Sequence, residues 1–175
     1  MTVFFEFEEV DAFAAAAIGE PGSRVFYLYA RAGEQRVSVK CEKQQVSAIS
    51  HYLRRVLSDL PPPDDRPMQS AVDPGPGGDE SFVLGPIGLG YDRGNDRLLV
   101  QLEELIQSDE DESTEEGDDD DDDDADRSHI RLYVTRGQAA AFCDQADEIV
   151  AAGRPSCMWC GNPIDPDGHP CPRMN

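Results

Sequence analysis

Residues 24–60, RVFYLYARAGEQRVSVKCEKQQVSAISHYLRRVLSDL, contain a change of hydrophobic period that points to a fold class. The aromatic and branched stretch 24–31 and the alternating stretch 36–41 flank a turn with glycine, which predicts a β-hairpin. In residues 42–60 the apolar side chains recur every three or four positions, which predicts an amphipathic helix. Prolines 61–63 then end it, because proline cannot continue a helix.

The second half of the chain has the same order of elements. Residues 82–92 and 97–105 predict another hairpin, and residues 128–135 predict a further strand. A second helix follows, and Thr135 with Gln138 forms a capping box at its start, in which both side chains satisfy free backbone groups.

The N-terminal residues predict one more strand. Val3, Phe5 and Phe7 alternate with Phe4, Glu6 and Glu8, a period of two that is typical of a strand with one polar face. Residues 12–22, closed by Pro21 and Gly22, are expected to form a connection.

Together these elements predict an α+β domain, a mostly antiparallel sheet with two amphipathic helices packed on it. Residues 39–45 and 132–138 look alike, since each stretch places a strand end, a cap-like residue, a basic residue and a glutamine before a helix. One interpretation is an internal repeat of two β-β-β-α halves. The other is that boundaries between strands and helices converge on such residues.

Acidic residues are concentrated in one segment. The chain has 36 acidic and 15 basic residues, a net charge of −21, and the dense acidic run covers residues 109–126. We predict a disordered acidic insertion over 107–127 and a Pro/Gly loop over 61–79, both within a domain of residues 1–152. Such acidity argues against binding to nucleic acid through phosphates, and against binding to anionic membranes.

The expected location is the cytoplasm. The N-terminus lacks the basic and apolar regions of a secretory signal, and no apolar run reaches the roughly 20 residues that span a bilayer. Cysteines in such a compartment stay reduced, so the five cysteines are expected to be metal ligands or core residues.

The C-terminal tail, residues 153–175, contains three of those cysteines and a histidine. Cys157 and Cys160 are separated by two residues and followed by glycine, a spacing that lets both sulfurs face one centre. His169 and Cys171 are two residues apart, so both side chains can point the same way in extended chain. Three sulfurs and one nitrogen predict a structural, four-coordinate zinc site; a disordered tail and a redox CxxC pair are the alternatives.

The tail motif CxxCGxPIDPxGHxCPR resembles the C-terminal signature of a bacterial family of domains of unknown function, number 3090. The stretches GEPGSRVFYLYAR, VKCEKQQV, GPIGLGYD and VTRGQAAAF resemble its other blocks. The resemblance implies that Cys157, Cys160, His169 and Cys171 match the cysteine-rich end of the family, and that its members are repeat-like proteins. It brings no established activity to this chain.

Other residues that could take part in binding or catalysis are more simply explained by a structural role. Gly85, Gly88 and Gly90 do not have the spacing of a dinucleotide fingerprint, and bulges or close backbone approach account for them better. Cys41 and Cys143 lie on apolar faces and are expected in the core.

Two classes of function remain. The first is a non-enzymatic interaction or regulatory protein whose zinc-bound tail is presented to a protein partner. The second is an enzyme acting on a phosphorylated or small-metabolite substrate through the Gly-rich hairpin and basic residues such as Arg24, Lys43 and Arg136. We favour the first, because no nucleophile, base and orienting group can be assembled from spacing. A deep polar pocket that joins Lys43, Arg24 and Asp92 would favour the second.

Overall fold

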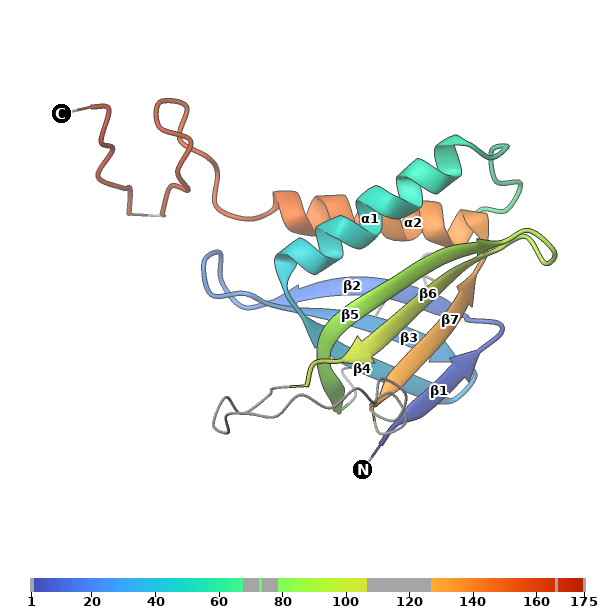
Figure 1. Ribbon diagram of the computed structural model, residues 1–175. Coiled ribbons are helices and arrows are strands. Elements are labelled where there is room, and N and C mark those ends of the chain that lie inside the picture. Colours follow the sequence, from blue (N-terminus) through green and yellow to red (C-terminus); the bar gives the residue numbers. More distant parts are fainter. Residues whose placement is uncertain (1, 68–72, 74–78, 107–126, 166, 175) are drawn as a thin grey trace, which may run out of the picture.

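The computed structural model describes residues 2–67, 73, 79–106, 127–165 and 167–174. A seven-stranded, mostly antiparallel sheet carries two helices, so the predicted α+β class is confirmed (Figure 1). The element bounds are β1 Phe4–Phe7, β2 Ala12–Ile18, β3 Val25–Ala32, β4 Gln35–Cys41, α1 Lys43–Ser58, β5 Glu80–Asp92, β6 Arg97–Glu104, β7 His129–Val134 and α2 Arg136–Ala151. The predicted acidic insertion, except its last residue, and most of the second half of the predicted Pro/Gly loop lie outside the described residues.

Two antiparallel units of three strands make up most of the sheet, which has the order β1-β7-β6-β5-β4-β3-β2. Strands β2, β3 and β4 pair in sequence order, as do β5, β6 and β7. The two units meet where β4 and β5 pair in parallel, and β1 pairs in parallel with β7. A parallel pair needs a crossover connection, and α1 lies in the one between β4 and β5. After β1, three strands and a helix thus follow each other twice, while the internal repeat in the sequence stays a prediction.

The predicted connection over residues 12–22 is wrong, because β2 is a regular strand that pairs with β3 along its whole length. Its first four residues are all buried, so the strand shows no alternation of apolar and polar residues. Helix α2 covers it, and the Phe13 ring stacks on that of Phe142 with centroids 4.3 Å apart. Alanine is also depleted in strands, so neither sequence signal marks β2.

Both helices begin with the same arrangement. In α1 the N–H of Glu42 donates a hydrogen bond to Oε1 of Gln45 at 2.8 Å. In α2 the N–H of Thr135 donates one to Oε1 of Gln138 at 2.9 Å. The predicted capping box at Thr135 is confirmed. The Nε2 of each glutamine then donates to a backbone carbonyl outside its helix, on β5 at 3.1 Å and just before β2 at 2.6 Å. Each glutamine therefore both caps its helix and fixes the position of that helix against the sheet.

Strand β5 joins the two units and bends between them. Its N-terminal part pairs with β4 and the rest with β6, and the register shifts between Leu84 and Ile87. A Cβ at Gly85 would lie 2.8 Å from Cα of Leu105, so the predicted close backbone approach is confirmed at this glycine. The Gly-rich segment therefore shapes the bend and lets β5 serve both units.

The core lies between the sheet and the helices. Every second residue of β6 and β7 is buried, and Phe7 of β1 is buried while Glu6 is exposed, which confirms the predicted alternation. The helices contribute Val46, Ile49 and Leu53 from α1 and Ala139, Phe142, Cys143 and Ala146 from α2. Within the described residues, neither helix combines the length and the apolarity that crossing a membrane requires.

Candidate metal centre

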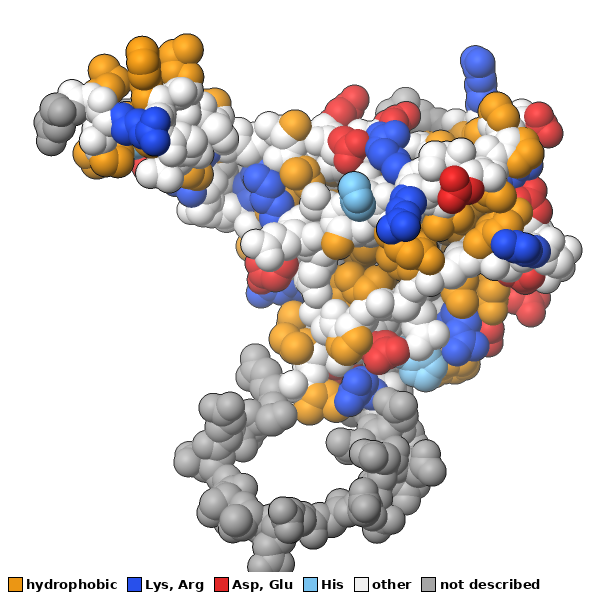
Figure 2. All heavy atoms as spheres, turned by 45° about the horizontal axis from the view of Figure 1, so that its top comes forward, with side chains coloured by type: hydrophobic (Ala, Val, Ile, Leu, Met, Phe, Trp, Pro, Cys, Tyr) orange, Lys and Arg blue, Asp and Glu red, His pale blue; other side chains and the backbone are white. Residues whose placement is uncertain are grey.

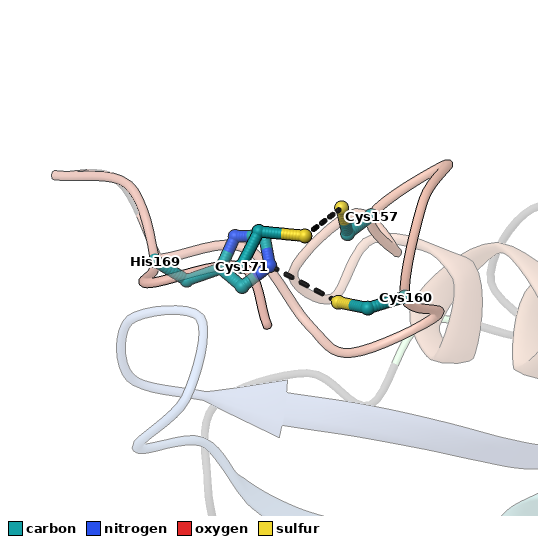
Figure 3. Close-up of side chains that lie close together, drawn as sticks. All are labelled: Cys157, Cys160, His169 and Cys171. Atoms are coloured by element: carbon teal, nitrogen blue, oxygen red, sulfur yellow. Dashed lines mark hydrogen bonds between the residues drawn. The ribbon is translucent and has the colours of Figure 1, made fainter. Parts of the chain in front are cut away.

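Four side chains of the tail converge on one point (Figure 3). Cys157, Cys160, His169 and Cys171 each offer one ligand atom, and all four atoms lie within 4.8 Å of one another. The Sγ atoms of Cys157 and Cys171 are 3.9 Å apart, and Sγ of Cys160 is 3.2 Å from Nε2 of His169. A tetrahedral ion with metal–sulfur and metal–nitrogen bonds of about 2.3 and 2.0 Å needs separations of roughly 3.8 and 3.5 Å. The cluster could therefore hold a metal ion.

The first pair of cysteines is oriented by a tight turn. The N–H of Trp159 donates to Sγ of Cys157 at 3.4 Å, and the N–H of Gly161 donates to the carbonyl of Cys157 at 2.8 Å. Gly161 has φ of +76°, which glycine adopts without steric cost. Gly161 therefore permits the tight turn behind the cysteine pair, and the turn directs both sulfurs to the same side (Figure 3).

The second pair of ligands reaches the centre through a return loop. A β-bridge between Ser156 and Pro163 brings the chain back, and Gly168, with φ of +93°, donates its N–H to the carbonyl of Asp165 at 2.8 Å. Arg154 forms an ion pair with the Asp165 carboxylate. Backbone pairing and this ion pair thus close the loop from which His169 and Cys171 project.

The thiols are poised to share a positive ion. The N–H groups of Cys160 and Trp159 donate to the Cys157 sulfur and hold the pKa of that thiol below its usual value. The N–H of Asn162 lowers the pKa of Cys160, but burial and the sulfurs of Cys157 and Cys171 outweigh it and raise the pKa overall. Neighbouring sulfurs resist becoming thiolates together unless a cation lies between them.

The remaining two cysteines lie in the core, as predicted. Cys41 and Cys143 are buried, and the Cys143 thiol donates to the carbonyl of Ser50 at 3.4 Å. Burial raises the pKa of Cys41 to about 12, with a further contribution from the Glu42 charge. Both thiols are therefore neutral at pH 7, which makes them poor nucleophiles.

The basic residues singled out from the sequence are only partly brought together. Arg24 and Lys43 line one cavity, whereas Asp92 lies beside a different hollow. Arg136, at the start of α2, forms an ion pair with Asp96 at 3.1 Å and donates to the carbonyl of Pro61. The deep pocket joining Lys43, Arg24 and Asp92 that would favour an enzyme is therefore not what these residues form.

Two further cations line the cavity of Arg24 and Lys43, namely Lys40 and Arg154. Sequence reasoning did not place them there, because Lys40 ends a strand and Arg154 follows α2 more than a hundred residues later. The only available signal was composition: Lys40 and Lys43 are the sole lysines of the chain and lie three positions apart.

A family of proteins described as a protein of unknown function, DUF3090, matches residues 5–171. The chain belongs to this family. The resemblance to DUF3090 seen in the sequence motifs is thus confirmed, and the match ends on Cys171, the last of the four clustered residues. Comparison with the curated proteins and with the solved structures finds no match. Because DUF3090 is defined without an activity, function has to be argued from the geometry of this chain.

Proposed function

We propose that this protein is a non-enzymatic interaction or regulatory protein, in which a structural zinc ion fixes the C-terminal tail for binding to a protein partner. The ligands are Cys157, Cys160, His169 and Cys171. The observation that carries the proposal is the exposure of Met158 and Trp159, 87% and 58%, between the first two ligands. An apolar pair held out into solvent by a metal-fixed turn is a favourable contact surface for another protein.

The donor set supports zinc as the ion. Three sulfurs and one imidazole nitrogen form a soft set, and zinc takes four such ligands in tetrahedral geometry. Four protein ligands leave no position for water, so the ion would be structural rather than catalytic. Among the described residues of the tail only Cys157 is buried, so burial alone contributes little to its order. Metal binding would then supply the free energy that orders the tail.

The outer surface of the tail supports a partner. Figure 2 shows hydrophobic side chains gathered on the tail, away from the body of the molecule. Met158 and Trp159 belong to residue types that are enriched in protein interfaces, and tryptophan is prominent among the residues that dominate binding energy. Met174, 71% exposed, lies beyond the last ligand and is not held by the turn.

The enzyme alternative has less support. A Cβ at Gly88 would lie 3.3 Å from the Gln101 side chain, and Gly85 adjoins the Leu105 backbone, so these glycines serve packing within the sheet. Arg136 is engaged with Asp96. These observations favour binding over catalysis.

The test compares capture of a partner by four forms of the full-length protein. The double variant Met158→Ser, Trp159→Ala removes the apolar pair, and Cys160→Ser removes a ligand. Met174→Ser is the matched control, because it removes an exposed methionine outside the turn. We expect a protein captured by the unmodified chain and by Met174→Ser to be lost from the other two forms.

Metal analysis of the same preparations separates the two halves of the proposal. After dialysis against a competing chelator, we expect about one zinc per chain in the unmodified protein and in the double variant, and a loss only in Cys160→Ser, whose weaker site releases the ion. Capture that survives in the double variant would refute the role of the apolar pair. A zinc content unchanged by Cys160→Ser would refute the metal site.

A further inference from the structure

A cavity of about 330 Å³ lies where the tail leaves the body. The starts of β3 and α1, the end of β4 and the first residues of the tail form its walls. Four basic residues line it, Arg24, Lys40, Lys43 and Arg154, and they include both lysines of the chain. The chain as a whole has a net charge of −21, but the field inside this cavity is positive and favours an anion.

Two of these cations are held close together. A Cβ at Gly153 would lie 3.0 Å from Nη2 of Arg24 and 3.1 Å from Nζ of Lys43, so no more than about 6 Å separates the two nitrogens. Arg24 is anchored, because its Nη1 donates to the carbonyl of Ile149 at 3.0 Å. Within the described residues, no carboxylate lies within ion-pair distance of Arg24, Lys40 or Lys43. A multivalent anion would remove their mutual repulsion.

We propose that this cavity binds a small soluble molecule through a phosphate monoester group. Such a group has a charge of about −1.5 to −2 at pH 7 and three strong acceptor oxygens, which suits the three cations without carboxylate partners. A guanidinium offers a fork of donors to phosphate oxygens, and an ammonium adds a compact charge. A carboxylate ligand, with one charge and two oxygens, would leave more of this positive charge uncompensated.

Two features limit the ligand to a small molecule. The cavity is smaller than most sites for drug-sized ligands, which are about 300–1,000 Å³, so it accommodates a phosphate with a short organic part. The overall negative charge repels nucleic acids and anionic membranes, whereas the basic cluster attracts one anion at short range, since salt screens charges beyond about 8 Å. Arg24, Lys40 and Lys43 belong to the body, and the exposed Met158 and Trp159 do not line the cavity, so binding of an anion there does not depend on the apolar pair proposed to contact a partner.

Calorimetric titration tests the proposal. Phenyl phosphate and benzoate are titrated separately into the full-length protein in a chloride buffer. We expect saturable binding of phenyl phosphate, and binding of benzoate at least about tenfold weaker because one charge-assisted hydrogen bond is lost. Lys43→Gln should weaken phenyl phosphate binding by about tenfold for the same reason. Gly153→Ala keeps every charge and requires the Arg24 and Lys43 ends to move only slightly, so it should weaken binding much less than Lys43→Gln.

Two variants control for charge and for folding. Arg55→Gln removes a cation from the last turn of the same helix, far from the cavity, and should leave the affinity unchanged. Glu42→Gln removes the single carboxylate of the lining and should tighten binding, a gain that a misfolded protein would not show. The proposal is overturned if phenyl phosphate shows no saturable binding below about 10 mM, or if Arg55→Gln weakens it as much as Lys43→Gln. Binding to vesicles with phosphatidic acid but not to phenyl phosphate would overturn the assignment to a soluble ligand.

Discussion

Replacing Gln45 by alanine tests the joint between α1 and the bend of β5. The side chain accepts the N–H of Glu42 and donates to the carbonyls of Leu84 and Gly85 at 3.1 and 3.2 Å. The two hydrogen bonds to these carbonyls are partly buried and contribute about 1 kcal/mol each to the free energy of unfolding. The hydrogen bond from the Glu42 N–H is exposed and contributes about 0.5 kcal/mol. Alanine regains about 0.4 kcal/mol of helix propensity. We therefore expect a net loss of about 2 kcal/mol.

Urea denaturation followed by far-UV circular dichroism measures this loss at fixed pH and zinc concentration. Gln44→Ala is the matched control, because Gln44 is exposed in the same turn of α1 and gains the same helix propensity. We expect the control to stay within about 0.5 kcal/mol of the unmodified protein. If Gln45→Ala costs no more than Gln44→Ala, the amide does not join the helix to the sheet and the reasoning is refuted.

Three further predictions concern the tail and the core. Cys160→Ser should lower zinc affinity by about a hundredfold, because four ligands share a binding free energy of about 10–16 kcal/mol. The anisotropy of the Trp159 fluorescence should fall as the tail loses its metal, and unchanged anisotropy would contradict a metal-ordered tail. Phe142→Ala removes a buried, stacked ring and should cost about 3–5 kcal/mol in urea denaturation, and a loss below about 1 kcal/mol would count against the packing of α2 on β2. Because burial raises the pKa of Cys41 from 9.0 to about 12, stability should decline as pH rises through that range, and Cys41→Ala should flatten the decline measured by urea denaturation; an equally steep decline in the variant would show that another group causes it.

Patterned elements could be predicted from the sequence because their periodicity reports one buried face. The helix expected over 42–60 is α1, Lys43–Ser58, and the hairpin strands lie within one residue of the expected 24–31 and 36–41. Strand β2 was not predicted, because its four consecutive buried residues show no alternation of apolar and polar side chains, and alanine has a low propensity for strands. One face of β2 is covered by α2, which lies more than a hundred residues away in the chain.

The four clustered residues of the tail could be predicted because short spacing alone constrains where their side chains can meet. The basic cavity could not, since its lining combines β3, β4, α1 and the tail, and only the tertiary fold brings Lys40 beside Arg154. The net charge of −21 argues against an anion-binding site, because a sum over the chain does not show where cations gather.

The parallel pairing of β1 with β7 has a consequence for how the protein is made. Phe5 pairs with Ile130, so β1 has no place in the sheet until β7, more than a hundred residues later in the chain, has been synthesised. During that interval the aromatic N-terminal segment is exposed on the nascent polypeptide, where an unpaired strand invites association. A fragment that stops before β7 would therefore contain β1 without the strand that pairs with it.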